Sequence, residues 1–199
     1  MSQLLPFILF AFVASITPGP TNVLVLNSSA QFGWRAALPL AVGACVGAAL
    51  IVLLVGLGLG EVLLRLPRVR QGMALFGVAW LSVLAWQLWR AAGDTLSRGA
   101  MGARVGAWGG AGLQLVNPKT WMMAMAVVSV FAGAQAGVAH YLIYALTFCL
   151  VAMPCLFVWA ALGHGAAVRL RSAQARRRFN RCMAVLLLGS AWSSLLISP

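Results

Sequence analysis

The sequence has very few acidic residues. Only two of its 199 residues are acids, Glu61 and Asp94, against 14 Lys and Arg; 8% of the chain is charged and 62% is hydrophobic. With a mean hydropathy of +0.95, this is not the balance of a soluble domain whose surface contacts water. The composition therefore predicts an integral membrane protein. No acid lies inside an apolar stretch, so proton coupling through a buried carboxylate is not available.

Metal-binding patterns are also missing. The four cysteines, Cys45, Cys149, Cys155 and Cys182, form no CxxC motif and have no neighbouring cluster of histidine and carboxylate. We interpret them as small buried hydrophobes and expect no metal and no cofactor. The N-terminus lacks a basic region and an A-x-A-like cleavage site, so we do not expect a removed signal peptide.

The excess of basic residues is interpreted as a topology signal, with no nucleic-acid partner expected, because most of them lie between apolar runs. Loops one, three and five carry most of the arginines, which predicts that these loops are cytoplasmic and both termini are outside. The second loop carries three arginines that oppose this rule. The arginines of the odd loops are Arg35, then Arg90, Arg98 and Arg104, then Arg169, Arg171, Arg176, Arg177, Arg178 and Arg181; those of the second loop are Arg65, Arg68 and Arg70.

Six apolar segments are long enough to cross a hydrocarbon core about 30 Å thick. Their approximate ranges are 4–30, 37–60, 72–91, 106–132, 141–162 and 182–197. The hydrophilic stretch 93–106 predicts a hinge between two halves, about 1–92 and about 105–199, of a single transmembrane domain that covers 1–199. We expect a kink at Pro154 in the fifth segment.

A helix-breaking motif interrupts the first segment. Its residues are Thr17, Pro18, Gly19, Pro20, Thr21 and Asn22. A proline inside a helix removes a backbone hydrogen bond and costs roughly 3 kcal/mol. We therefore expect free carbonyls at Ala14 and Ile16, and Thr17 as the N-cap of a second half-helix. Because lipid does not tolerate irregular backbone, this break must be buried in protein or line a polar cavity.

A second motif of this kind interrupts the fourth segment. Pro118 releases the carbonyl of Gln114, and Asn117 is a natural N-cap for a half-helix that begins at Pro118. Lys119 follows roughly 20 Å into the span, at about 1.5 Å per residue. A lysine at that depth costs about 2.5–3.5 kcal/mol, so it should face a partner or a cavity. Snorkelling of its side chain to an interface is the alternative.

Broken helices in corresponding positions of two sets of three spans predict an inverted repeat, because three is an odd number. Half-helix N-termini attract anions, whereas unwound carbonyls attract cations. Together these ends suit a zwitterion. We expect the carboxylate of an amino acid at the N-termini after Pro20 and Pro118, and its ammonium on the carbonyls near Ala14 and Ile16. The candidate substrate-binding residues are Thr17, Pro18, Gly19, Pro20, Thr21, Asn22, Gln114, Asn117, Pro118 and Lys119.

Two other classes of function compete with a transporter. A membrane hydrolase would need a nucleophile beside a base, and no span places a histidine near a serine or pairs two acids, so we predict no catalytic residues and no enzyme. We interpret His140 and His164 as interfacial residues. A passive channel or an assembly subunit stays open, because small-residue motifs such as Gly43-x-x-x-Gly47 pack helices without requiring transport.

The chain resembles the LysE/RhtB family of bacterial amino-acid exporters. The resemblance covers the TPGPTN motif at 17–22, the stretch 33–47, the NPK motif at 117–119, and 159–163 with the arginines after it. It implies a small inner-membrane protein, and the segments and breaks described above predict an all-α integral membrane fold with six spans in two inverted repeats. It also implies export of amino acids or close derivatives, driven by the proton or membrane potential, and often an oligomer.

Two departures from this family affect the expected substrate. Many members carry an aspartate where this chain has Ala48, and many have TPGPN where it has TPGPT. Without a buried acid the site should favour neutral amino acids such as homoserine, threonine or cysteine/O-acetylserine. The segments 80–89 and 159–164 look closest to the cysteine/O-acetylserine exporter branch of this family.

Overall fold

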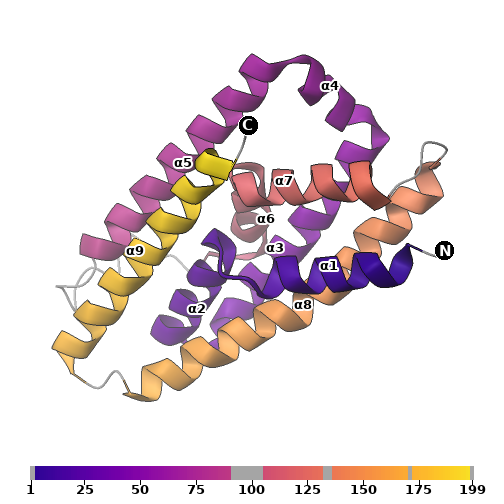
Figure 1. The fold of residues 1–199 in the computed structure, drawn as a ribbon. Coiled ribbons are helices and arrows are strands. Elements are labelled where there is room, and N and C mark those ends of the chain that lie inside the picture. Colours follow the sequence, from indigo (N-terminus) through magenta and orange to yellow (C-terminus); the bar gives the residue numbers. More distant parts are fainter. Residues whose placement is uncertain (1–2, 91–104, 132–135, 170–171, 198–199) are drawn as a thin grey trace.

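A computed structural model describes residues 3–90, 105–131, 136–169 and 172–197, and every regular element in these ranges is a helix. Figure 1 shows their arrangement. In chain order they are α1 (Leu4–Ile16), α2 (Pro20–Phe32), α3 (Trp34–Leu54), the π-helical turn η1 (Val55–Leu59), α4 (Gly60–Arg65), α5 (Pro67–Arg90), α6 (Ala107–Leu115), α7 (Pro118–Ala126), the π-helical turn η2 (Val127–Phe131), α8 (Val138–Arg169) and α9 (Ala173–Ile197).

Several of these helices can cross a bilayer. Three stretches are long and apolar enough, namely Trp34–Leu63, Gln71–Arg90 and Val138–Ala167. Helices α1 and α2 meet at an angle of 53° and pass the same test only as a pair. The described residues therefore hold three candidate spans, or four if the bent pair counts as one, and the chain is a multi-pass membrane protein.

The structure changes one detail expected from the sequence. We expected the basic residues before the last segment in a loop, but α9 begins at Ala173, so Arg176 and Arg181 lie in its first turns. Arginine is a good helix former, and hydropathy marks only the apolar part of a helix. Helix α8 includes Pro154, and the kink expected there stays a prediction. Most of the predicted hinge, its residues 93–104, lies outside the described residues.

Helix α3 lies at the centre of the packing, against α2, α6 and α8. Its contact with α6 depends on small residues. A Cβ added at Gly47 would lie 2.8 Å from the Cα of Ala111, and one added at Gly43 would collide with the carbonyl of Ala107. The predicted role of these two glycines, close helix packing, is what the structure shows. This contact fixes α6, and with it the second break, beside the centre of the molecule.

Helices α5 and α9 form a pair along one edge of the molecule, seen at the left of Figure 1. Their seam is apolar, since Leu81 and Leu88 of α5 and Leu187 of α9 are at most 1% exposed. Helix α8 instead runs beneath α1, α2 and α3 and contacts all three. The pair α1–α2 thus packs on α8, and the pair α6–α7 packs on α3.

Candidate functional site

The first break covers residues 17–19, between α1 and α2. Thr17 has an extended conformation and ends α1, because its N–H and its hydroxyl both donate to the carbonyl of Val13. Gly19 is the residue before α2, and Pro20 occupies the first helical position. The prediction that Thr17 caps the second half-helix was therefore wrong. The N–H and the hydroxyl of Thr17 both donate to α1, the helix that precedes it, and not to α2.

Three successive carbonyls at this break are bound by side chains from three different helices. Such carbonyls lose their partners within the helix when it ends, and side-chain donors can replace those partners. The donors and acceptors are Asn22 Nδ2 to Ser15 O (2.8 Å), Trp159 Nε1 to Ile16 O (3.2 Å) and Lys119 Nζ to Thr17 O (2.8 Å). The carbonyl of Ile16, which we expected to be free for an ammonium group, is thus bound by an indole.

The second break covers residues 116–117, between α6 and α7. As predicted, Asn117 is the N-cap of α7 and Pro118 its first residue. The Oδ1 atom of Asn117 accepts a hydrogen bond from the backbone N–H of Lys119 (3.2 Å). The backbone carbonyl of Asn117 accepts one from the backbone N–H of Thr120 (3.0 Å). The first N–H groups of α7 therefore have partners. In α2 the first intrahelical bond is from Val23 N to Gly19 O (3.1 Å), and the N–H groups before it point out of the helix end.

Four polar side chains join the two breaks, and we call them the bridging cluster: Thr21, Gln114, Asn117 and Thr120. Asn117 Nδ2 and Gln114 Nε2 lie 3.1 and 3.2 Å from Thr21 Oγ1, and Thr120 Oγ1 donates to Gln114 Oε1 (2.8 Å). Gln114 and Thr120 are each 2% exposed. Because buried polar groups need partners, this cluster fixes α2 against α6 and α7.

A small polar cavity of about 40 Å³ lies where the breaks meet. Most of the predicted site residues line it, except that Pro18 is exposed and Pro118 is buried behind it, while Thr17 contributes its carbonyl to Lys119. Residues lining the cavity that were predicted are Gly19, Pro20, Thr21, Asn22, Gln114, Asn117 and Lys119. Ala14, whose carbonyl we expected near the ammonium, lines it as well. Those missed are Ser15, Ala44, Cys45, Ala48, Thr120, Met123, Phe148, Ala152 and Leu156.

The missed residues differ in how they could have been found. Thr120 directly follows the NPK motif, so it belongs to the first turn of α7 that the motif predicts. Ala44 and Ala48 are four residues apart on α3, a spacing that places them on one face. Phe148 and Leu156 of α8 belong to an unbroken apolar helix, and their place at the cavity depends on how the helices pack.

The charge in this cavity comes from Lys119, and no carboxylate is among the residues that line it. The Lys119 side chain is half-buried and lies across Gly19, where an added Cβ would come within 3.0 Å of its Cδ and 3.1 Å of its Nζ. Gly19 thus leaves the room that brings the ammonium to the first break. A cation bound by a neutral carbonyl retains its attraction for an anion.

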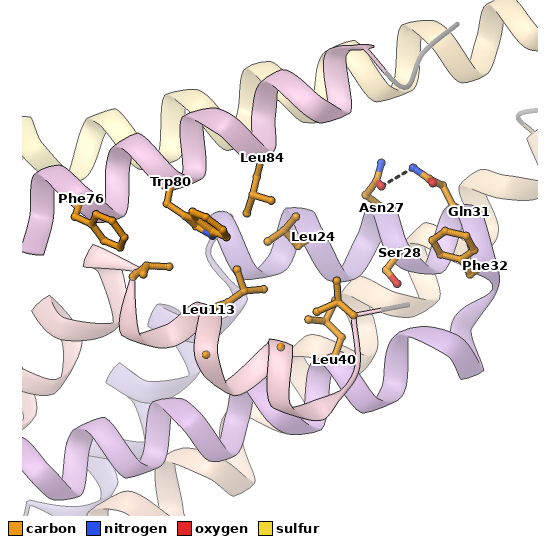
Figure 2. A pocket seen from close by; sticks show the side chains of 14 residues that line it. Leu24, Asn27, Ser28, Gln31, Phe32, Leu40, Phe76, Trp80, Leu84 and Leu113 are labelled. Carbon is orange, nitrogen blue, oxygen red and sulfur yellow. Dashed lines mark hydrogen bonds between the residues drawn. The ribbon is translucent and has the colours of Figure 1, made fainter. Parts of the chain in front are cut away.

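A larger pocket of about 420 Å³ lies between α2, α5 and α6 (Figure 2). Its walls are mainly apolar, with Leu24, Trp80 and Leu113 among them, and its amides gather at one end, where Gln31 Nε2 donates to Asn27 Oδ1 (2.7 Å). None of the predicted site residues lines it, and neither does a charged residue. The smaller cavity is therefore the better candidate for binding a charged solute.

The fold and this cavity define an all-helical, multi-pass membrane protein with a cationic polar site between two helix breaks. The chain belongs to the LysE type translocator family, whose match covers residues 12–197. The family resemblance seen in the sequence is thus confirmed.

Named relatives lie within the same family. The chain is 28% identical over 166 residues to a cysteine/O-acetylserine efflux protein of Salmonella choleraesuis (80% of this chain, 84% of the relative). It is 27% identical over 191 residues to a homoserine/homoserine lactone efflux protein of Salmonella typhimurium (92% of this chain, 90% of the relative). No solved structure matches the chain.

Proposed function

We propose that this protein is a secondary transporter that exports neutral amino acids or close derivatives across the bacterial inner membrane. The observation that carries this proposal is the position of Lys119. Its ammonium lies 2.8 Å from Thr17 O, where the two breaks meet, in a cavity without a carboxylate. A buried cation in that setting favours the carboxylate of a solute.

The carboxylate would bind between Lys119 and the N-terminal turn of α2. The N–H groups of Thr21 and Asn22 precede the first intrahelical bond of α2, whereas the first N–H groups of α7 are capped by Asn117. The end of α2 is therefore the better anion site of the two. This refines the expectation that both N-termini share the carboxylate.

The ammonium of the solute would take the place that the Lys119 ammonium now occupies. Lys119 Nζ donates to the carbonyl of Thr17. A carboxylate that draws Lys119 toward itself releases this carbonyl, which can then accept from the ammonium of the same amino acid. One hydrogen bond within the protein would thus be exchanged for two charge-assisted contacts with the solute.

The cavity wall supports a neutral side chain. Ala48, which stands where many family members carry an aspartate, lines the cavity itself, with Ala44 and Cys45 on the same helix. No acid is therefore present there to balance the second positive charge of a lysine or arginine substrate. The relatives named for efflux of cysteine/O-acetylserine and of homoserine agree with a small neutral solute.

Transport would require the cavity to open. About 40 Å³ holds water molecules but not an amino acid, since ligand pockets commonly measure 300–1,000 Å³. We propose that two inverted repeats of three spans, about 1–92 and about 105–199, move against each other around the site, with α1–α2 and α6–α7 as their broken first spans. The oligomeric state stays a prediction.

Efflux from cells that express the protein tests this function. Cells are preloaded with dipeptides, and efflux is measured over a panel of about twenty labelled amino acids. Cells that express the protein should lose neutral amino acids faster than cells without it, and an uncoupler should abolish this difference in efflux rate. A passive channel would release solutes regardless of the uncoupler, and an assembly subunit would change no rate. Either of those results would contradict the proposal.

A further inference from the structure

The hydroxyl of Ser15 is a buried group without a hydrogen-bond partner. Within the described residues, Ser15 Oγ is the one buried side-chain polar atom that lacks such a partner, and the residue is 8% exposed. Ser29, the other buried serine of the described residues, is bonded: its Oγ donates to the carbonyl of Ala160 (2.6 Å). Buried polar groups in proteins are nearly always satisfied, so this exception calls for a cause.

Ser15 lies at the polar cavity, on the last turn of α1 before the first break. It lines the cavity together with Asn22, whose Nδ2 binds the Ser15 carbonyl at 2.8 Å, and with Ala44 and Ala48 of α3. The lining thus includes the cation of Lys119 and a serine whose hydroxyl is buried without a partner. Its walls from α3 and α8 are small or apolar.

We propose that Ser15 determines specificity by forming a hydrogen bond with the side chain of the transported amino acid. The inference rests on the proposed function, in which Lys119 and the first break hold the carboxylate and the ammonium. A serine hydroxyl both donates and accepts, so it can pair with an uncharged side-chain hydroxyl, thiol or ester carbonyl. The solutes selected are small neutral amino acids with a hydrogen-bonding side chain, ahead of aliphatic ones of equal size.

The Ser15 hydroxyl should discriminate between solutes with polar and with aliphatic side chains, and not only add to their affinity. A bound aliphatic side chain would leave the Ser15 hydroxyl buried without a partner, which is costly, whereas a polar side chain satisfies it. A neutral hydrogen bond of ordinary strength corresponds to a preference of about tenfold. Removing the hydroxyl should therefore remove the preference and leave transport of the aliphatic solute intact.

Two pairs of labelled amino acids of equal size provide the test, threonine with valine and homoserine with norvaline. Export from cells that express the wild type should favour the hydroxyl member of each pair by about tenfold. In Ser15→Ala the ratio should approach one, because export of the hydroxyl member falls while that of the aliphatic member holds. Ser15→Cys should keep part of the preference.

Ser29→Ala serves as the matched control, since Ser29 is a buried serine outside the cavity. It should keep the wild-type preference but lower the melting temperature in detergent, because the carbonyl of Ala160 loses its donor. Ser15→Ala should not lower it. If Ser15→Ala keeps the preference, or melts lower as Ser29→Ala does, the hydroxyl has a structural role and the inference is wrong. If the wild type exports other amino acids of the panel but no member of either pair, the inference is wrong; if it exports none of the panel, the proposed function fails.

Discussion

Lys119 and Gly19 lie against each other at the meeting point of the two breaks. Lys119 is the single lysine of the chain, and its long side chain reaches the carbonyl of Thr17 from another helix. Gly19 permits this contact because it has no Cβ. Glycine is used where a group must approach the backbone closely. Gly19 of the first motif thus positions the ammonium that Lys119 of the second motif supplies.

Gly19→Ala should weaken export by moving Lys119. The added Cβ would lie 3.0 Å from Lys119 Cδ and 3.1 Å from its Nζ, so the Lys119 side chain must move away from Gly19 by a few tenths of an ångström, which disturbs its hydrogen bond with Thr17 O. We expect a fall of about tenfold in the apparent affinity for the exported amino acid, measured as efflux against internal concentration. Gly165→Ala, in open space on α8, is the control and should leave efflux unchanged. Equal efflux in both variants would show that the position of Lys119 does not matter.

At the scale of elements, the breaks are held together by side chains as well as by apolar packing. The bridging cluster links α2 to α6 and α7, while Asn22 and Trp159 bind carbonyls at the end of α1. Because lipid offers no hydrogen-bond partners, irregular backbone must find them within the protein. The polar residues of both motifs therefore stabilise the breaks and also line the cavity.

A double-mutant cycle between Thr21 and Asn117 measures this link. Asn117 Nδ2 donates to Thr21 Oγ1 (3.1 Å), and Asn117 also caps α7. Asn117→Ala should lower the free energy of unfolding by about 1 kcal/mol for the cap alone. Thr21→Val should lower it less when Asn117 is already Ala, with a coupling energy of about 0.5–1.5 kcal/mol. Strictly additive losses in reversible unfolding would mean that the cluster does not couple the two helices.

Much of the local structure at the breaks could be predicted from the sequence, and less of their surroundings. The N-cap at Asn117 could be predicted because asparagine precedes a proline there. The close approach of another helix at Gly43 and Gly47 could be predicted from the spacing of the two glycines. The hydrogen-bond partner of the Thr17 hydroxyl could not be predicted, because a threonine can cap the helix that follows it or donate to a carbonyl of the helix that precedes it, here that of Val13. Trp159 binding to Ile16 O depends on the packing of α8, which no local pattern contains.

For the whole molecule, the open question is how the helices are inserted in the membrane. The distribution of arginines predicts six spans with loops one, three and five in the cytoplasm. Single cysteines at positions 137 and 172, in a chain whose four native cysteines are replaced by alanine, test this. An impermeant thiol reagent should label Gly137→Cys in intact cells and Ser172→Cys only after permeabilisation. The opposite pattern, or labelling of both in intact cells, would contradict the predicted topology.

The most direct test of the account is export by Lys119→Met. The substitution keeps a long side chain but removes the charge that we propose binds the carboxylate. The variant should fold, with a somewhat lower melting temperature because the Thr17 carbonyl loses its donor, and it should lose export of neutral amino acids. Arg178→Met, which removes an exposed cation on α9, is the matched control and should export normally. Wild-type efflux from a folded Lys119→Met protein would contradict the central claim that this lysine binds the transported solute.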